Sequence, residues 1–322
     1  MAQQTLREVL MKNKVMDPAL IDNLSKESGF LRTAFAFKSS NGYIHKYKLY
    51  NALPTFGIVS PGSASAGTTA TSNVKQLDLK ICRSIQDEPA DIVDTYPDGR
   101  SAYFDDQLPA YLESYGQAVS KGVFYGYNST FGYSEGFKGL HQMAKEYGNV
   151  TQMVGTTGSR TSIFAVSFKP SVCGLVVNSE VIKGTAPFLN IDVMNGGNPV
   201  MNTYNTTTMT KQKVYQIDYY SWLAFLSASS YDVSAITQIQ DDTNDKPTSA
   251  GMDTMLDQVR AEAGKTIIYC NRTARRLLYE LKNSKMQTIP GDKDFNNVLE
   301  TWNGIPLVLD ENILDTETTV LD

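Results

Sequence analysis

The chain has 322 residues, of which 41% are hydrophobic and 20% charged, and its formal net charge is −5. That length suffices for two or three subdomains with a sizeable core, and the acidic balance excludes nucleic-acid binding driven by overall charge. Three cysteines without a CxxC pair and only two histidines weigh against a zinc site and a histidine-based catalytic machine. Residues 1–16 are too polar for a secretory signal, and no apolar run approaches the ~18 residues of a membrane span.

Residues 1–42 are predicted to form an N-terminal arm that begins with two short helices. Thr5-Leu-Arg-Glu8 is a capping box, and Asp17-Pro18 places an N-cap residue before a proline at the first helical position. Gly29 is expected to end the second helix. Helices of about eight residues bury little surface alone. We therefore expect the arm to pack on the body or on a neighbouring subunit.

Residues 43–93 are predicted to form an extended loop, a β-hairpin with a soft tip. Alternating, strand-like segments at 43–50 and 74–82 flank a run of small residues at 60–72. A hairpin of this kind rarely stabilises itself in water. The run is therefore either an ordinary disordered loop or an arm that becomes ordered on a partner. The second interpretation makes the tip an assembly site, with Pro61, Gly62 and Gly67.

Residues 94–240 are predicted to pack a long helix, about 106–125, on a β-sheet. The helix has apolar residues at the i, i+3, i+4, i+7 spacing of one helical face, namely Leu108, Tyr111, Leu112, Tyr115, Val119 and Val123. Pro109 is tolerated if the helix begins near Asp106, and Gly126 is expected to end it. A short helix is expected at 134–147, and strands are expected at 162–168, 173–178, 213–226 and 231–239.

Residues 241–300 read as a small mixed α/β unit that follows a polar loop. Met252, Met255 and Leu256 predict an amphipathic helix, and a buried-type strand at Thr266–Cys270 leads into a helix capped by Asn271. Strands are then expected over 301–322. A turn lies in that stretch, formed by Asn303, Gly304, Ile305 and Pro306.

The sequence contains no recognisable active-site motif. Gly155-Thr-Thr-Gly158 lacks the Gly-Lys-Ser/Thr ending of a phosphate loop. The acidic cluster at Asp241, Asp242 and Asp245 lacks the central glycine and closing glutamate of a calcium loop, which favours a solvated linker. No nucleophile elbow, zinc-protease helix or dinucleotide fingerprint occurs. The sequence thus predicts no catalytic, cofactor-binding or metal-binding residues, no cofactor and no enzyme.

The order of these parts resembles the major capsid proteins of tailed bacteriophages with the Hong Kong 97-type fold, in particular the short-tailed group typified by epsilon-15. Two segments carry the most specific similarity, Ile267–Leu278 and the Asn303–Pro306 turn followed by Asp310. Other segments resemble the family by order and spacing. Thr161–Pro170 with Gly174–Val177 is similar to a strand pair, and Tyr215–Leu226 with the strand after it is similar to a long β-hairpin.

The resemblance implies an α+β fold with the family's domains. These would be an N-terminal arm (1–42), an extended loop (43–93), a peripheral domain with a spine helix (94–240), an axial domain (241–300) and C-terminal strands returning to the peripheral domain (301–322). It implies a virion protein, made in the bacterial host cytoplasm, that assembles into pentamers and hexamers around double-stranded DNA. Implied partners are itself, a separate scaffolding protein, a portal, a decoration or cement protein and non-specifically packaged DNA, but no membrane. An encapsulin-like compartment shell and, from another class, an uncharacterised hydrolase remain as alternatives.

Overall fold

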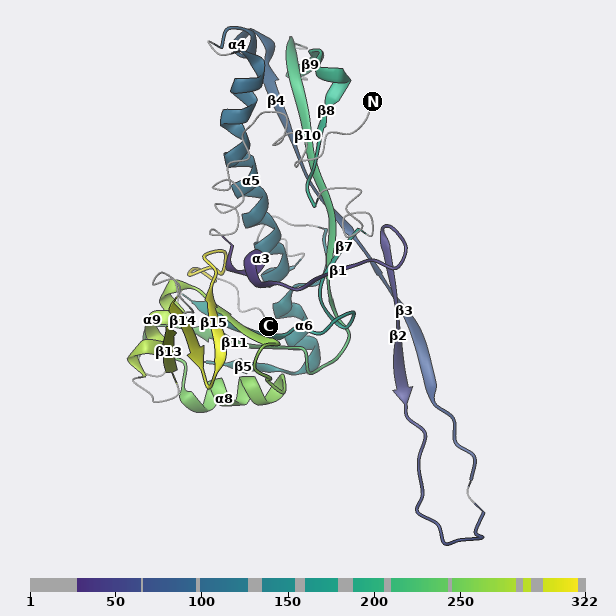
Figure 1. Cartoon of the computed structure of the whole chain (residues 1–322). Helices are drawn as coiled ribbons and strands as arrows, with labels where there is room; N and C mark the ends of the chain where they lie inside the picture. Colours follow the sequence, from purple (N-terminus) through teal and green to yellow (C-terminus); the bar gives the residue numbers. More distant parts are fainter. Residues whose placement is uncertain are drawn as a thin grey trace.

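The structure is a computed structural model, and it describes residues 28–64, 66–96, 99–126, 135–153, 160–178, 188–205, 210–242, 245–281, 286–290 and 298–317. Within these ranges the chain forms a six-stranded sheet, a seven-stranded sheet and a separate two-stranded hairpin. Figure 1 shows one long helix beside the six-stranded sheet, the seven-stranded sheet at the lower end of this helix, and the hairpin projecting away from both. The fold is α+β, as the sequence predicts.

The long helix α5 spans Arg100–Tyr125 and presents the predicted apolar face to the core. It begins earlier than predicted, so Pro109 lies inside the helix and not in its first turn. Pro109 is exposed, and it has no N–H to donate within the helix. Gly126 ends the helix with a φ of 69°, and a Cβ there would collide with the backbone of Gly139.

The six-stranded sheet is built around the long strand β10 (Thr210–Ser227). Strand β4 (Lys80–Pro89) runs antiparallel along one side of β10, and no described strand pairs with the outer edge of β4. Along the other side of β10 lie three shorter strands, β9 (Val200–Asn205), β8 (Asn190–Val193) and β7 (Cys173–Val177). Strand β1 (Ala36–Lys38) completes the sheet by pairing with β7 in parallel. A 3₁₀ turn, η2 (Met194–Gly197), joins β8 to β9.

The seven-stranded sheet has the order β13-β14-β15-β12-β6-β11-β5. Its strands are β5 (Val150–Gln152), β6 (Thr161–Ser167), β11 (Val233–Ile239), β12 (Thr266–Cys270), β13 (Met286–Pro290), β14 (Val298–Trp302) and β15 (Ile305–Leu309). Three helices accompany it, α6 (Leu140–Tyr147), α8 (Ser249–Gln258) and α9 (Arg272–Glu280). Strand β12 has the predicted bounds. The Asn271 side chain caps α9, because its Oδ1 accepts a hydrogen bond from the Ala274 backbone N–H at 2.8 Å.

The predicted division of the chain at residue 240 does not separate the two sheets. Strands β5, β6 and β11 precede that residue, whereas β12 to β15 follow it, and all seven belong to one sheet. Strands β14 and β15 were predicted to return to the first sheet, but Trp302, Ile305 and Leu307 fill the core beneath α8 and α9. Val308 of β15 belongs to the main core, which also contains the buried face of α5. Farther on, the Leu314 N–H donates to the Tyr125 hydroxyl of α5.

Two family-like pairings suggested by the sequence are also wrong. Strands β6 and β7 lie in different sheets, and so do β10 and β11. In each case the chain crosses from one sheet to the other through a short turn, at 168–172 and at 228–232. Local patterns predict strands well, but they do not decide whether two consecutive strands pair with each other or enter different sheets.

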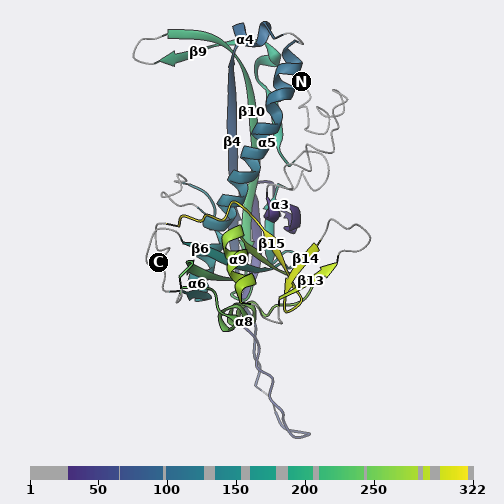
Figure 2. The same cartoon turned by 90° about the vertical axis from the view of Figure 1, so that its left-hand side faces the viewer.

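The predicted hairpin is present as β2 (Ile44–Ala52) and β3 (Thr71–Asp78), which pair antiparallel with each other. It ends earlier than predicted, because Leu79 is buried and the chain continues directly into β4 of the six-stranded sheet. A short helix, α4 (Ala90–Asp94), follows β4. Figures 1 and 2 both show the hairpin as a thin extension of the molecule.

The N-terminal segment departs most from its prediction. Both helices predicted before residue 28 lie outside the described residues. Gly29 does not end a helix but begins one, α3 (Gly29–Thr33), which is capped by Ser28. Gly29 contacts β15 so closely that a Cβ would collide with the Leu309 carbonyl oxygen. Phe30 is fully buried in the main core, so residues 28–38 belong to the body rather than to a free arm.

Candidate assembly surfaces

The described residues bring together no recognisable catalytic group. No set of three or more His, Cys, Asp or Glu side chains in these ranges is placed to hold a metal ion. Burial, helped by the charge of Lys145, lowers the pKa of His141 to about 4. Of the acidic cluster predicted to be a solvated linker, Asp241 and Asp242 are exposed, and Asp241 pairs with Lys246 and Arg276 at 3.1 and 2.6 Å, but Asp245 is buried. Gly155 and Gly158 lie outside the described residues, and none of the described helices is long and apolar enough to cross a membrane.

The predicted tip residues lie at the far end of the hairpin and are exposed. Pro61 and Gly62 form a turn closed by a 3.0 Å hydrogen bond from the Ser63 N–H to the Ser60 carbonyl. Gly62 has a φ of 87°, which favours glycine, and neither Gly62 nor Gly67 would bring a Cβ within 4 Å of another group. There is therefore room beside Gly62 and Gly67 for a neighbouring molecule.

Large apolar side chains stand in solvent beside this tip. Leu53 is 77% exposed, Phe56 92%, and Ile58 is fully exposed. Residues 53–70 contain no charged side chain. An uncharged, apolar segment that packs on nothing marks an interaction site. These apolar residues were not predicted as part of the assembly site, because that prediction rested on the small residues of the tip. The signal that could have identified them is the Leu53-Pro-Thr-Phe-Gly-Ile-Val59 run.

A second exposed surface follows the outer edge of β4. Ile81 and Ile85 on this strand are 45% and 49% exposed. Because no described strand pairs with that edge, its backbone N–H and C=O groups are open to another extended segment. A cavity of about 340 Å³ lies beside it, lined in part by Ile81, Val119, Phe137 and Leu223. This surface, here called the β4 edge, offers both hydrogen bonds and apolar contact.

Of the predicted turn residues, Asn303 and Gly304 form a tight turn, whereas Ile305 and Pro306 begin strand β15. This turn between β14 and β15 is not near the hairpin tip (Figure 1). Asn303 and Gly304 have φ angles of 50° and 79°, and they join Trp302 of β14 to Ile305 of β15. This pair of left-handed residues is the preferred two-residue connection of a β-hairpin. The Asn303 side chain also donates to Asp253 Oδ1 at 3.1 Å. The segment thus has a structural role within the seven-stranded sheet.

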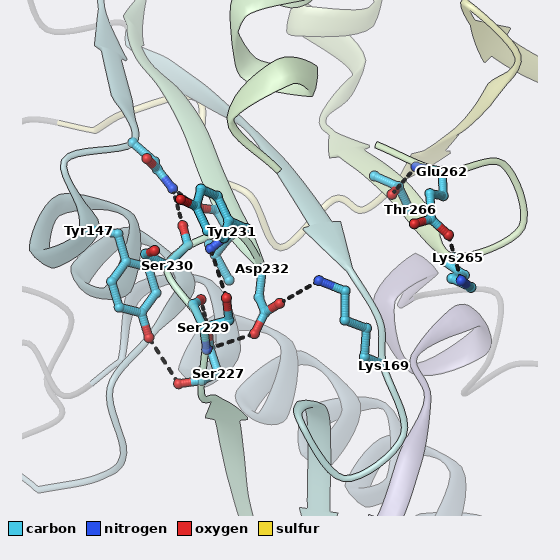
Figure 3. A network of polar contacts seen from close by, with 12 residues as sticks. Tyr147, Lys169, Ser227, Ser229, Ser230, Tyr231, Asp232, Glu262, Lys265 and Thr266 are labelled. Atoms are coloured by element: carbon cyan, nitrogen blue, oxygen red, sulfur yellow. Dashed lines mark hydrogen bonds and ion pairs between the residues drawn. The ribbon is translucent and has the colours of Figure 1, made fainter. Parts of the chain in front are cut away.

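The two turns that cross between the sheets are held together by a partly buried ion pair (Figure 3). Lys169 Nζ lies 2.9 Å from Asp232 Oδ1, and the Ser229 N–H donates to Asp232 Oδ2 at 2.9 Å. Asp232 is fully buried, and Tyr147 donates to the Ser227 carbonyl next to it at 2.9 Å. Lys169 comes from the β6–β7 turn and Asp232 from the β10–β11 turn. Their pairing therefore restrains one sheet relative to the other.

Replacing Asp232 by alanine should lower the free energy of unfolding by about 2–3 kcal/mol, because Lys169 and the Ser229 N–H would lose their acceptor. Glu146→Gln is the matched control. It breaks the exposed Lys138–Glu146 pair, which should cost about 0.5 kcal/mol or less. Urea unfolding of both variants measures the difference. Equal effects of the two substitutions would contradict the role assigned to Asp232.

A further junction is made by the C-terminal segment after β15. The Phe30 N–H donates to Asp310 Oδ2 at 2.8 Å, which ties α3 to this segment. Farther on, Glu317 accepts hydrogen bonds from Tyr125 of α5 and Ser162 of β6, both at 2.7 Å. Glu317 is 3% exposed, and burial raises the pKa of its carboxyl group to about 7 despite these two donors. The C-terminal segment thus connects α3, α5 and β6.

Glu317→Gln should remove a pH dependence of stability. The folded-state pKa lies above the ordinary value of 4.5, so the folded protein holds a proton that the unfolded chain has released. This contribution is complete below about pH 4.5 and is lost as the pH rises through about 7, which amounts to about 3 kcal/mol. Between pH 5 and pH 8.5 the wild type should therefore lose stability relative to the glutamine variant. Parallel urea curves at both pH values would disprove this.

Comparisons with known proteins identify the fold. No family model and no curated protein matches the chain. Among solved structures, a chain of the cryo-EM-derived structure of bacteriophage Epsilon15 is 16% identical, with a TM-score of 0.58, over 90% of this chain and 88% of that one. A chain of the bacteriophage JBD30 capsid decorated with minor capsid protein trimers is 12% identical, with a TM-score of 0.50, over 92% and 99%. The chain therefore has the Hong Kong 97-type fold that its sequence resemblance implied.

Proposed function

We propose that the protein is the major capsid protein of a tailed bacteriophage, which assembles into the pentamers and hexamers of an icosahedral shell around double-stranded DNA. The observation that carries this proposal is the structural match to a chain of the Epsilon15 phage over 90% of this chain and 88% of that one. The protein is then a component of the virion.

The division of the molecule into a clamped body and an open appendage supports the proposal. A shell subunit must fit five-fold and six-fold surroundings, which requires a rigid part and an adaptable part. The body has one core shared by α5 and both sheets, whereas the hairpin carries Phe56 and Ile58 into solvent. The ordering cost of such an appendage is met when it binds its neighbours.

Within this shell, we propose that the hairpin tip of one subunit lies on the β4 edge of the next. The tip supplies an uncharged segment with free backbone groups, and the β4 edge supplies a free strand with Ile81 and Ile85 exposed. Both surfaces lack a partner among the described residues of the chain, and each has the complement that the other needs. A scaffolding protein, a portal and a decoration protein are proposed as further partners, and packaged DNA as a non-specific one.

The two alternatives gain no specific support. Both structural matches described above come from phage particles and not from enzyme-filled compartments. For a hydrolase, the two histidines would have to act on a substrate, yet both are buried and have lowered pKa values.

Expression of the chain alone and with the proteins encoded beside its gene, followed by negative-stain microscopy, tests the proposal. Capsomers or closed shells of uniform size are expected in at least the second case. A chain that remains monomeric with every gene neighbour, while its circular dichroism shows a folded protein, would refute it. Cargo enzyme inside the shells instead of phage proteins would favour the compartment.

A further inference from the structure

The hairpin is held on the body by a small apolar cluster at its base. The buried members of this cluster are Phe37, Leu79, Val176, Ala224 and Leu226. The hairpin contributes Tyr47 and Leu77 to it. At the base, the Leu79 N–H donates to the Tyr43 carbonyl at 2.9 Å and closes the two strands of the hairpin on each other. Beyond this cluster the two strands extend away from the body (Figure 1). The cluster is therefore the hinge on which the orientation of the hairpin depends.

One ionisable side chain, His45 of β2, lies within this hinge. Its ring centroid is 5.6 Å from that of Phe37 and 6.2 Å from that of Tyr47. His45 is 7% exposed, and neither Nδ1 nor Nε2 has a hydrogen-bond partner in the described part of the chain. A buried imidazole without partners is stable only when neutral, because burial of the charged form costs far more. Burial accordingly lowers the pKa of His45 below its ordinary value.

The groups around His45 do not offset a positive charge on it. The lysines Lys38 and Lys46 on β1 and β2 are exposed and of the same sign. On β3, Asp78 is exposed and accepts from Gln76 at 2.7 Å. From the other elements come Lys138, paired with Glu146 at 2.6 Å, and Tyr147, which donates to Ser227. A protonated His45 would therefore find a partner only in water.

We propose that His45 is a proton-operated lock on the hairpin hinge. The neutral imidazole packs against Phe37 and holds the hairpin docked on the body. The imidazolium reaches water only when the base of β2 separates from Phe37, so protonation releases the hairpin. The ring of Tyr43, 4.3 Å from that of Trp222 at the same base, would separate with it. This lock is a property of the single chain and does not depend on the proposed function.

The size of the effect follows from proton linkage. The released hairpin exposes His45, whose pKa then returns to about 6.5, whereas the docked state has the lower value. Between these two values, the ratio of released to docked hairpin should rise about tenfold for each unit of pH decrease. Above pH 6.5 the lock is fully closed, and it opens progressively as the pH falls.

Tryptophan fluorescence and amide exchange can follow the hinge directly. The chain has two tryptophans. Trp222 lies at the hinge, and Trp302 is fully buried in the other core. Acrylamide quenching of the wild-type protein should therefore rise severalfold from pH 7.5 to pH 5 while the far-ultraviolet circular dichroism stays constant. Amide exchange of β2 and β3, corrected for the intrinsic rate at each pH, should stay constant down to about pH 6.5 and then accelerate by about tenfold per unit as the pH falls further.

His45→Phe is the decisive variant, since a phenyl ring suits the apolar cluster and cannot be protonated. Its quenching and its corrected exchange should not change with pH. His141→Phe, which removes the other buried histidine, should keep the wild-type transition. If His45→Phe does not fold, His45→Gln replaces it with the same expectation. The proposal is overturned if the wild type shows no transition, or if the transition survives in the His45 variant.

Discussion

Replacing Phe30 by alanine is expected to lower the free energy of unfolding by about 3–5 kcal/mol, the usual cost of removing a fully buried phenylalanine. The ring is fully buried and meets four other aromatic rings, with centroid separations of 5.9 Å to Phe124, 6.4 Å to Phe168, 6.2 Å to Phe225 and 5.4 Å to Tyr269. These partners come from α5, from both sheets and from the turn between them. A cavity at this point would weaken the joint between all of them. Urea unfolding followed by circular dichroism gives the value.

Phe35→Ala serves as the control, because Phe35 lies in the same segment but is 42% exposed. We expect it to cost about 1 kcal/mol or less. If the two substitutions had equal and small effects, residues 28–38 would not be part of the core. A large loss for Phe30 alone would establish that the segment is part of the core.

The double substitution Phe56→Ser and Ile58→Ser is expected to abolish shell assembly while leaving the isolated subunit intact. Each side chain is almost fully exposed in the single chain, so the free energy of unfolding should change by about 0.5 kcal/mol or less. On a neighbouring subunit each would contribute about 1.5–3 kcal/mol of apolar burial. The pair therefore weakens each contact by about 3–6 kcal/mol, or roughly 10²- to 10⁴-fold in its equilibrium constant. Sedimentation and negative-stain microscopy measure the loss.

Ile92→Ser is the matched control for the double variant. Ile92 is 53% exposed on α4, which lies at the end of the molecule far from the hairpin (Figure 1). It makes a similar change to the exposed apolar surface without touching the tip. Normal shells from the double variant would show that the tip plays no part in assembly. Loss of shells in both variants would point to a general effect of apolar surface instead.

The sequence predicts the local elements of this protein well. The apolar face of α5, the bounds of β12 and the Asn271 cap all depend on neighbours close in the chain, and all three predictions are confirmed. The turn at Asn303 and Gly304 is confirmed for the same reason, because its conformation depends on the two residues that form it. The end of the hairpin at Leu79 was placed too late, since only packing against β7 and β10 stops the alternating pattern there.

The assembly surfaces could be predicted only in part. The hairpin and its open tip follow from alternation and from small residues, so Pro61, Gly62 and Gly67 lie where they were expected. The β4 edge could not be foreseen, because an edge strand has the same residue pattern as a strand paired on both sides. His45 is another such case, since a lone histidine in a strand gives no sign of whether its nitrogens find partners.

Family resemblance, helix faces, caps and turns were therefore readable from the order of residues alone, because each depends on contacts within a few positions of the chain. Apart from the hairpin of β2 and β3, the pairing of strands was not. The pairing of β12 with β15, the separation of β6 from β7 and the burial of Phe30 each depend on segments far apart in sequence. Such contacts depend on how apolar surfaces from the whole chain pack together. A hydrophobic period of two or 3.6 residues shows which face of a strand or helix is buried, but it does not show which element packs against that face.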